Sequence, residues 1–119
     1  MKVILRPHDP VLDGELPDAF KEFLLEPHLW IGVAVVLAKN TSDAPVTDVD
    51  VELLSETEGM WTQLGRQHVD ELGSGLTTPP TWGGQRDFRI EEMRGRVYYT
   101  DEAGDRWEMW HDGTHRELS

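Results

Sequence analysis

The stretch DVDVEL, residues 48–53, decides the predicted fold. Aliphatic residues occupy its odd-numbered positions and carboxylates its even-numbered positions, which is the two-residue period of a strand with one buried face and one solvated face. Upstream of it, residues 30–37 are apolar, aromatic or β-branched on both faces, and they predict a central strand that is covered on both sides. The turn-forming residues 40–45 lie between the two strands, so we expect the strands to form an antiparallel pair.

The rest of the chain adds further strands and one helix. Residues 3–5 predict a short strand, and residues 17–26 predict a helix, because Pro17 suits a first helical turn and Pro27 disfavours helical geometry before it. Residues 97–99 and 106–110 predict a hairpin. Asp112-Gly113 predicts a two-residue turn that pairs Trp110 with His115. Residues 78–84 contain two prolines and two glycines, and we expect a long surface connection there.

About six or seven short strands, with turns roughly every ten residues, predict a mainly β fold. We expect one domain over residues 1–119, in which residues 1–28 provide an N-terminal strand and the short helix and residues 29–119 provide the remaining strands. An antiparallel β-sandwich is the first expectation, a partly open barrel the second and an α+β sheet the third. The expected core residues share an inward position in these strands: Ile31, Val33, Val35, Leu37, Val49, Val51, Leu53, Phe88, Ile90, Val97, Tyr99, Trp107 and Met109.

The chain is strongly acidic, with 11 basic and 23 acidic residues and a net charge of −12. Such a charge repels phosphates, so we expect no direct nucleic-acid binding and a protein partner instead. The absence of cysteine excludes disulfides and cysteine-based zinc sites. The longest apolar run, residues 29–38, is about half the length that spans a bilayer, and no signal peptide is evident. We therefore expect no membrane insertion and a cytoplasmic or virion-associated protein.

Two groups of residues resemble metal ligands. His111 and His115 have the H-x3-H spacing of some zinc sites, and Asp101 and Asp105 flank a turn that resembles a calcium-binding loop. A third ligand for the histidine pair is not evident, although Asp112 or Glu117 could serve, and the alternating acids of an EF-hand are absent. We therefore expect solvated histidines and an acidic hairpin turn, with no metal or other cofactor.

Three tryptophans are the candidate binding residues: Trp61 and Trp82 lie near predicted loops, and Trp110 falls on the opposite strand face from Trp107. Tryptophan that is exposed among polar residues is typical of binding hot spots, although tryptophan also fills sandwich cores. The sequence therefore predicts partner contacts at these three side chains.

The carboxylates of the deciding stretch, Asp48, Asp50 and Glu52, form a row with a period of two that Glu56 and Glu58 extend. One interpretation is a solvated face opposite arginines of a neighbouring strand. The other is a docking strip for a basic partner. Such exposed carboxylates would stay ionised together, so they do not suit an acid–base pair.

Catalytic motifs are missing from the sequence. No serine lies in a nucleophile elbow, and the glycines form neither a phosphate-binding loop nor a dinucleotide motif. We therefore expect that the protein is not an enzyme.

Two segments resemble a known family. Residues 36–51, VLAKNTSDAPVTDVDV, resemble an early hairpin of bacterial immunoglobulin-like domains, and residues 99–107, YTDEAGDRW, resemble the last hairpin of such modules in actinobacterial proteins. The resemblance covers about a quarter of the chain. It implies an immunoglobulin-like antiparallel β-sandwich with an accessory or adhesive role, and it implies no particular site residues.

These observations favour a non-catalytic binding or structural module, such as an accessory or assembly protein of a phage or a bacterium. Two alternatives stay open. The first is an acidic inhibitor that mimics nucleic acid and occupies a basic host protein, and the second is a carbohydrate-binding sandwich that stacks sugars on tryptophans. The edge strands of a sandwich can also pair between chains, which would give a homo-oligomer.

Overall fold

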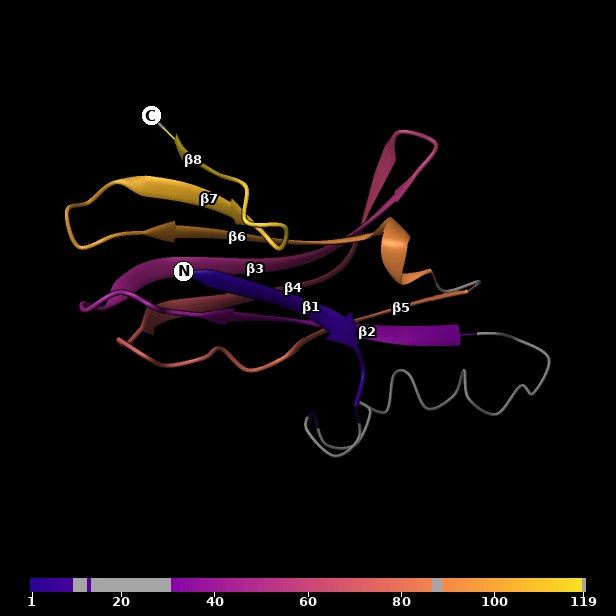
Figure 1. Ribbon diagram of the computed structural model, residues 1–119, viewed down its shortest axis with the longest axis horizontal. Coiled ribbons are helices and arrows are strands. Elements are labelled where there is room, and N and C mark those ends of the chain that lie inside the picture. Colours follow the sequence, from indigo (N-terminus) through magenta and orange to yellow (C-terminus); the bar gives the residue numbers. More distant parts are fainter. Residues whose placement is uncertain (10–12, 14–30, 87–88, 119) are drawn as a thin grey trace.

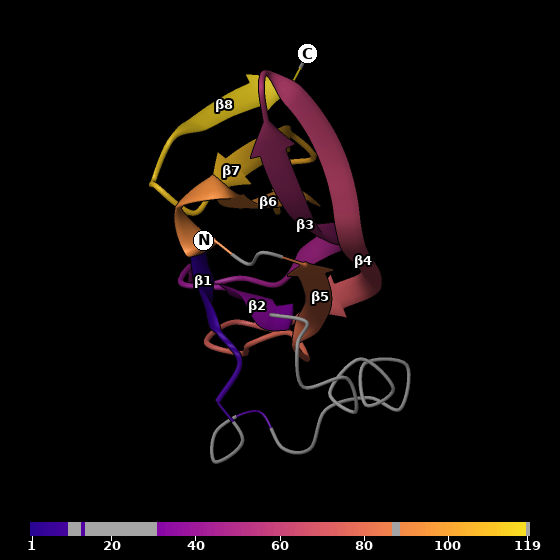
Figure 2. The ribbon, with the colours of Figure 1, turned by 90° about the vertical axis from the view of Figure 1, so that its right-hand side faces the viewer.

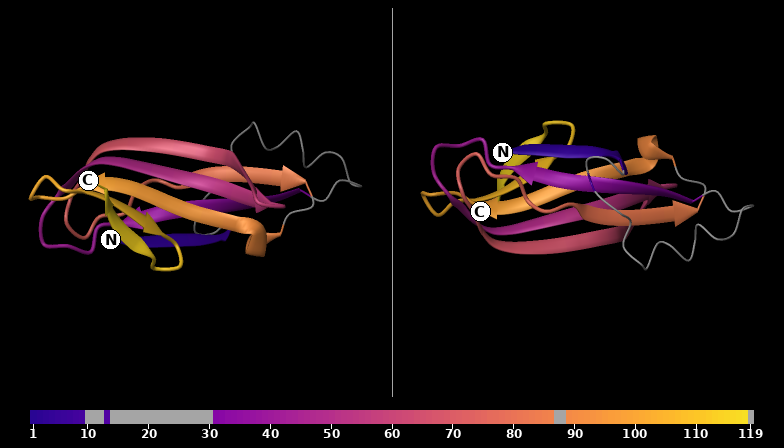
Figure 3. Two further views of the ribbon diagram at one scale, coloured as in Figure 1. Left: turned by 90° about the horizontal axis from the view of Figure 1, so that it is seen from above. Right: turned by 90° about the horizontal axis from the view of Figure 1, so that it is seen from below.

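The computed structural model describes residues 1–9, 13, 31–86 and 89–118, which form two antiparallel sheets and a 3-10 turn, η2 (Ile90–Glu92). The three-stranded sheet has the order β1-β2-β5 and contains β1 (Lys2–Pro7), β2 (Ile31–Lys39) and β5 (Thr81–Arg86). The five-stranded sheet has the order β4-β3-β6-β7-β8 and contains β3 (Val46–Thr57), β4 (Met60–Leu72), β6 (Met93–Thr100), β7 (Arg106–Trp110) and β8 (His115–Leu118). The sheets lie face to face in Figures 1 and 3, so the fold is mainly β and is compatible with the expected sandwich. The helix predicted over residues 17–26 and the expected core residue Phe88 lie outside the described residues.

The core lies between the two sheets and is built largely from inward-facing aliphatic side chains. The three-stranded sheet contributes Val3, Ala34, Val36 and Ala38, and the five-stranded sheet contributes Val49, Val51, Leu53, Met93 and Val97. The prediction that residues 49, 51 and 53 point inward is confirmed, as is the core position of Val97. Ile90, Tyr99 and Met109 pack against this core as partly buried residues, whereas Trp107 is half-buried.

Strand β2 is central, as predicted, but its inward face is the opposite one. Ala34 pairs with Gly83, and a Cβ atom on Gly83 would lie 2.3 Å from the core side chain of Leu53, so the even-numbered residues of β2 face the other sheet. Val33 and Val35 are also buried, but on the outer side of their sheet. A strand that is apolar on both faces carries no information about which face meets the second sheet.

The predicted pairing of β2 with β3 is wrong, because residues 40–45 connect one sheet to the other. Strand β2 pairs with β1 and β5, while β3 pairs with β4 and β6. Buried Asn40 stabilises the crossing: its Nδ2 donates to the carbonyl oxygens of Ala44 (2.8 Å) and Leu72 (3.0 Å), and its Oδ1 accepts from Ser42 N (3.0 Å). These bonds satisfy the backbone of the crossing loop without a strand ladder.

The middle of the chain contains more strand than its sequence predicted. Residues 60–72 form the single strand β4, and β5 begins at Thr81, inside the expected surface connection. A Cβ atom on Gly65 would lie 2.1 Å from the carbonyl oxygen of Trp82, so the glycines at 65 and 83 let β5 approach β4 and β3. The same residues that weaken a strand pattern are therefore required for this packing.

The β3–β4 hairpin bends away from the core at its tip. The pairing register shifts between Leu53 and Leu54, which is typical of a β-bulge, and bulges increase local bending and twist. Glu58 and Gly59 both have positive φ, as the tight turn at the tip requires. Figure 2 shows this tip rising toward β7 and β8, which makes the outer face of the five-stranded sheet concave.

The C-terminal hairpins are present with one change of register. Tyr99 pairs with Trp107, as the predicted hairpin requires. The next turn is one residue longer than predicted, because Met109 rather than Trp110 pairs with His115. Trp110 N donates to Thr114 O (2.8 Å), and Gly113 has a φ of 92°, which is the geometry of a three-residue loop with a left-handed last residue.

Candidate functional site

The outer face of the five-stranded sheet, defined as the side that points away from the three-stranded sheet, carries two of the three predicted acids. Asp50 accepts hydrogen bonds from His68 Nδ1 (2.8 Å) and Arg106 Nη2 (3.0 Å), and Glu52 accepts one from Arg96 Nε (3.2 Å). Asp48 lies at a register irregularity of β3, has a φ of 47° and is exposed. Asp50 and Glu52 are thus paired with cations of neighbouring strands, as the interpretation of a solvated face opposite arginines expects.

The charges on this face shift one another's protonation. Burial raises the pKa of the Asp50 carboxyl, but the hydrogen bonds and charges of His68 and Arg66 outweigh burial, so the net pKa is lowered. Hydrogen bonding to Asp50 raises the pKa of His68, with a further contribution from Asp70. The outer face therefore carries an ion-pair network.

Glu108 fixes the orientation of Trp110. Its carboxylate is buried and accepts hydrogen bonds from Trp110 Nε1 (2.6 Å) and Arg116 Nη2 (3.1 Å). Burial raises the pKa of Glu108, but the bonds from Arg116 and Trp110 outweigh it and leave the net pKa lowered. An ionised carboxylate thus holds the indole of Trp110 by its polar edge.

Three aromatic side chains and one arginine form a row across the same face, which we call the aromatic row. Its members are Trp61, Trp110, Arg96 and Tyr98. The indole rings of Trp61 and Trp110 lie with centroids 5.7 Å apart and planes at 48°. The guanidinium carbon of Arg96 lies 5.2 Å from the Trp110 ring and 5.0 Å from the Tyr98 ring. These spacings are those of tilted aromatic pairs and cation–π contacts. The row brings together two tryptophans that are 49 residues apart in the sequence.

A shallow hollow of about 220 Å³, the Trp61–Trp110 hollow, lies at the end of this row. Its lining combines two aromatic rings with charged and hydroxyl groups: Glu56, Trp61, Arg94, Trp110, Asp112 and Thr114. Within the described residues, Glu56 forms no ion pair, and Arg94 uses only Nη1, which donates to the carbonyl oxygens of Glu91 and Met93. A carboxylate and a guanidinium therefore face the hollow with bonding capacity left over.

Asp112 enters the hollow from the β7–β8 turn. Its Oδ1 accepts a hydrogen bond from Thr114 N (2.9 Å), and this backbone bond is the main cause of its lowered pKa. In the sequence, Asp112 was predicted as a turn residue and as a candidate third ligand of the His111–His115 pair, whereas Arg94 and Thr114 were not predicted as site residues. Alternation along β6 identifies the face of Arg94, but its position beside Trp61 depends on the bend of the hairpin.

Trp82, the third tryptophan candidate, lies elsewhere. It pairs with Val35 on the outer side of the three-stranded sheet, and its ring lies 4.9 Å from the imidazole of His8. The structure therefore brings Trp61 and Trp110 together and leaves Trp82 on the opposite side of the molecule.

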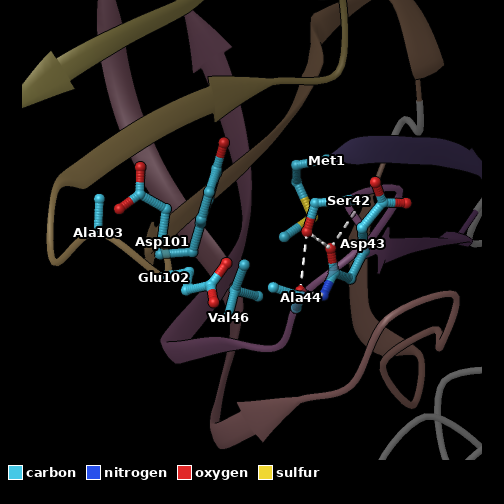
Figure 4. A pocket seen from close by; sticks show the side chains of 10 residues that line it. Met1, Ser42, Asp43, Ala44, Val46, Asp101, Glu102 and Ala103 are labelled. Atoms are coloured by element: carbon cyan, nitrogen blue, oxygen red, sulfur yellow. Dashed lines mark hydrogen bonds between the residues drawn. The ribbon is translucent and has the colours of Figure 1, made fainter.

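A second hollow, of about 340 Å³, lies where the 40–45 crossing faces the β6–β7 turn. Figure 4 shows Met1, Ser42 and Asp43 on one side and Asp101, Glu102 and Val46 on the other. The carboxylate of Asp101 accepts hydrogen bonds from Trp107 Nε1 and Asp105 N, each 2.9 Å long, and the bond from Trp107 is the largest cause of its lowered pKa.

The side chains predicted as candidate metal ligands are spread over the β6–β7 and β7–β8 hairpins. Asp101 and Asp105 share one turn, and Asp105 enters it through its backbone N–H. His111 Nδ1 accepts a hydrogen bond from Gly95 N (3.2 Å), and burial, reinforced by a nearby arginine, lowers the pKa of His111. His115 lies 6.0 Å from the ring of Trp107. In the described ranges, no three histidine or carboxylate side chains are grouped as a metal site requires.

Comparison with other proteins gives no relative: no protein-family model, characterised protein or solved structure matches this chain. In the part of the chain that the structure describes, no helix is long and apolar enough to cross a membrane. The interpretation of the two hollows therefore depends on their own geometry and chemistry.

Proposed function

We propose that this chain is a non-catalytic binding module and that its recognition surface is the Trp61–Trp110 hollow with the adjoining aromatic row. The observation that carries the proposal is the position of Trp61, whose surface is 48% exposed while its ring lies against Trp110. Exposed tryptophan that borders a hollow is the residue type that most often anchors a partner.

The surface is held in place before any partner arrives. Trp110 is fixed at its nitrogen by Glu108 and at its face by Arg96, and Arg96 is itself bound to Glu52. Binding to side chains that are already ordered loses less conformational entropy than binding to mobile ones. The fixed orientation of Trp110 therefore supports a role of this side chain in recognition.

We also propose that the fold is immunoglobulin-like, and the strand order supports this. In immunoglobulin-type sandwiches, strands A, B and E belong to one sheet and strands C, F and G to the other. Here β1, β2 and β5 form one sheet, while β3, β6 and β7 lie together in the other, with β4 beside β3 and β8 beside β7. Strand β4 then corresponds to strand C′ of variable-type domains, and β8 is an addition.

The chemistry of the hollow favours binding over catalysis. An acid catalyst needs a carboxyl group whose pKa is raised toward neutrality, whereas the pKa of Asp112 is lowered. Thr114, the hydroxyl residue of the lining, is accompanied there by no histidine that could activate it. We therefore propose a binding role alone.

The internal pairing of Asp50 and Glu52 argues against the nucleic-acid-mimic alternative. A mimic presents its carboxylates to a basic partner, while these two are occupied by Arg106, His68 and Arg96. A partner would have to displace those cations first.

The test is a quantitative capture experiment from a lysate of the source organism. Immobilised wild-type protein is compared with Trp61→Ala, and with Trp82→Ala as the control, because Trp82 lies on the other sheet. We expect a specific ligand that Trp82→Ala retains and Trp61→Ala loses by about tenfold or more. Circular dichroism confirms that both variants are folded. Equal capture by all three proteins would refute the proposed surface.

A further inference from the structure

We propose that the ligand of the Trp61–Trp110 hollow is a carbohydrate, with one pyranose ring stacked on the indole of Trp61. This inference rests on the proposed function, since it names the ligand class of the same surface. It uses the side chains that line the hollow and their unused bonding capacity.

The aromatic part of the hollow suits one face of a sugar ring. The face of an indole carries partial negative charge, and the C–H groups on one side of a pyranose carry partial positive charge, so the two surfaces attract each other as they exclude water. Trp61 is the more exposed member of the pair, with 48% of its surface accessible, and its ring contacts that of Trp110 with centroids 5.7 Å apart and planes at 48°. A ring on Trp61 would also have its edge near the polar residues of the lining.

The polar part of the hollow suits hydroxyl groups, which both donate and accept hydrogen bonds. Glu56 offers a carboxylate acceptor, while Arg94 offers donors beyond the Nη1 that it uses for Glu91 and Met93. Thr114 adds a hydroxyl that can act in either direction. Vicinal hydroxyls of one sugar can therefore satisfy the acceptor and the donors together.

Other ligand classes fit these groups less well. An apolar side chain of a protein partner would cover Glu56 and Arg94 without giving them hydrogen bonds, and buried polar groups without partners are destabilising. A lysine or arginine side chain would be attracted by Glu56 and Asp112 but would lie beside the guanidinium of Arg94, and the Trp110 ring already has Arg96 at 5.2 Å. The volume of about 220 Å³ is also below the range of about 300–1,000 Å³ that is usual for drug-sized ligands, which favours a single ring over a peptide segment.

The test begins with the labelled full chain on an array of immobilised plant, bacterial and animal oligosaccharides. Saccharides that bind are then titrated in solution by calorimetry and by tryptophan fluorescence. We expect Trp61→Ala to weaken the dissociation constant by about tenfold or more, and Trp61→Phe to recover part of the loss because it restores a flat ring. Glu56→Gln should weaken binding several-fold, because a carboxylate accepts stronger hydrogen bonds than an amide.

Two matched variants serve as controls. Trp82→Ala removes a tryptophan of the opposite sheet, and Glu58→Gln removes a carboxylate of the same hairpin that does not line the hollow. Both should bind like the wild type. The carbohydrate proposal is overturned if no saccharide on the array binds, or if binding is unchanged in both Trp61 variants.

The outcomes also separate this inference from the proposed function. If no saccharide binds, but a protein captured from the lysate is lost with Trp61→Ala, the surface is correct and the ligand class is wrong. If neither saccharide nor protein binding depends on Trp61, both proposals fail.

Discussion

Asn40 connects the two sheets, and its replacement should be among the most damaging polar substitutions in the described part of the chain. The side chain is 1% exposed, and its amide donates to Leu72 O in a buried bond and to Ala44 O in a partly buried one, while its Oδ1 accepts from Ser42. Asn40→Ala leaves the Leu72 carbonyl buried without its partner, at about 1–3 kcal/mol, and loses about 1 kcal/mol for the partly exposed bonds. The free energy of unfolding should fall by about 3 kcal/mol.

Urea unfolding followed by tryptophan fluorescence measures this change. A loss of about 3 kcal/mol moves the midpoint by roughly 1–3 M urea, since the slope for small proteins is about 1–3 kcal/mol per M. Asn40→Asp keeps the shape but places a carboxylate against two carbonyl oxygens, so it should be at least as unstable as Asn40→Ala. Asp43→Asn is the control, because Asp43 is exposed in the same loop, and it should change stability by less than about 0.5 kcal/mol. A loss below about 1 kcal/mol for Asn40→Ala at an unchanged slope would refute the assigned role.

Two further predictions concern β4. Gly65→Ala should lower the free energy of unfolding by about 3 kcal/mol in urea unfolding, because its Cβ would lie 2.1 Å from the backbone carbonyl oxygen of Trp82. Gly73→Ala is the control: its Cβ would meet only the flexible side-chain end of Leu76, so the loss should be less than about 1 kcal/mol. Equal losses for the two variants would contradict the close approach of β4 and β5. His68 should titrate above its ordinary pKa of about 6.5 in an NMR pH series and return toward it in Asp50→Asn, so its stabilising contribution is present below about pH 6.5 and is lost as the pH rises through the folded-state pKa. A pKa of His68 that is unchanged by Asp50→Asn would disprove the pairing.

The strands whose buried face could be predicted are those that are apolar on one face and polar on the other. Val49, Val51 and Leu53 alternate with acids, so the sequence itself shows which side of β3 is buried, and the structure agrees. Strand β2 is apolar on both sides, and its inward residues include Ala34 and Ala38. Alanine is smaller and less hydrophobic than valine, so a ranking by hydrophobicity favours the opposite face, which carries Val33 and Val35.

The remaining differences arise from contacts that are distant in sequence. The crossing of residues 40–45 between sheets depends on the bond from Asn40 to Leu72, which lies 32 positions away. Strand β5 depends on glycines that local propensity treats as breakers. The contact between Trp61 and Trp110 depends on the bend of the β3–β4 hairpin, and the register shift at that bend lies between Leu53 and Leu54, away from both tryptophans. The sequence therefore identified both residues as binding candidates but not their proximity.

The strand order also determines when the chain can become a folded protein. The central strand of the three-stranded sheet, β2, needs β5 as its second neighbour, and β3, an interior strand of the five-stranded sheet, needs β6. A nascent chain that has not yet reached residue 81 can form the β1–β2 and β3–β4 pairs, yet β2 and β3 each still have one unpaired edge. Unpaired edges are templates for intermolecular pairing, and sheets that depend on distant partners fold slowly. Until β6 has been synthesised, β3 therefore retains an edge of the kind that pairs between chains.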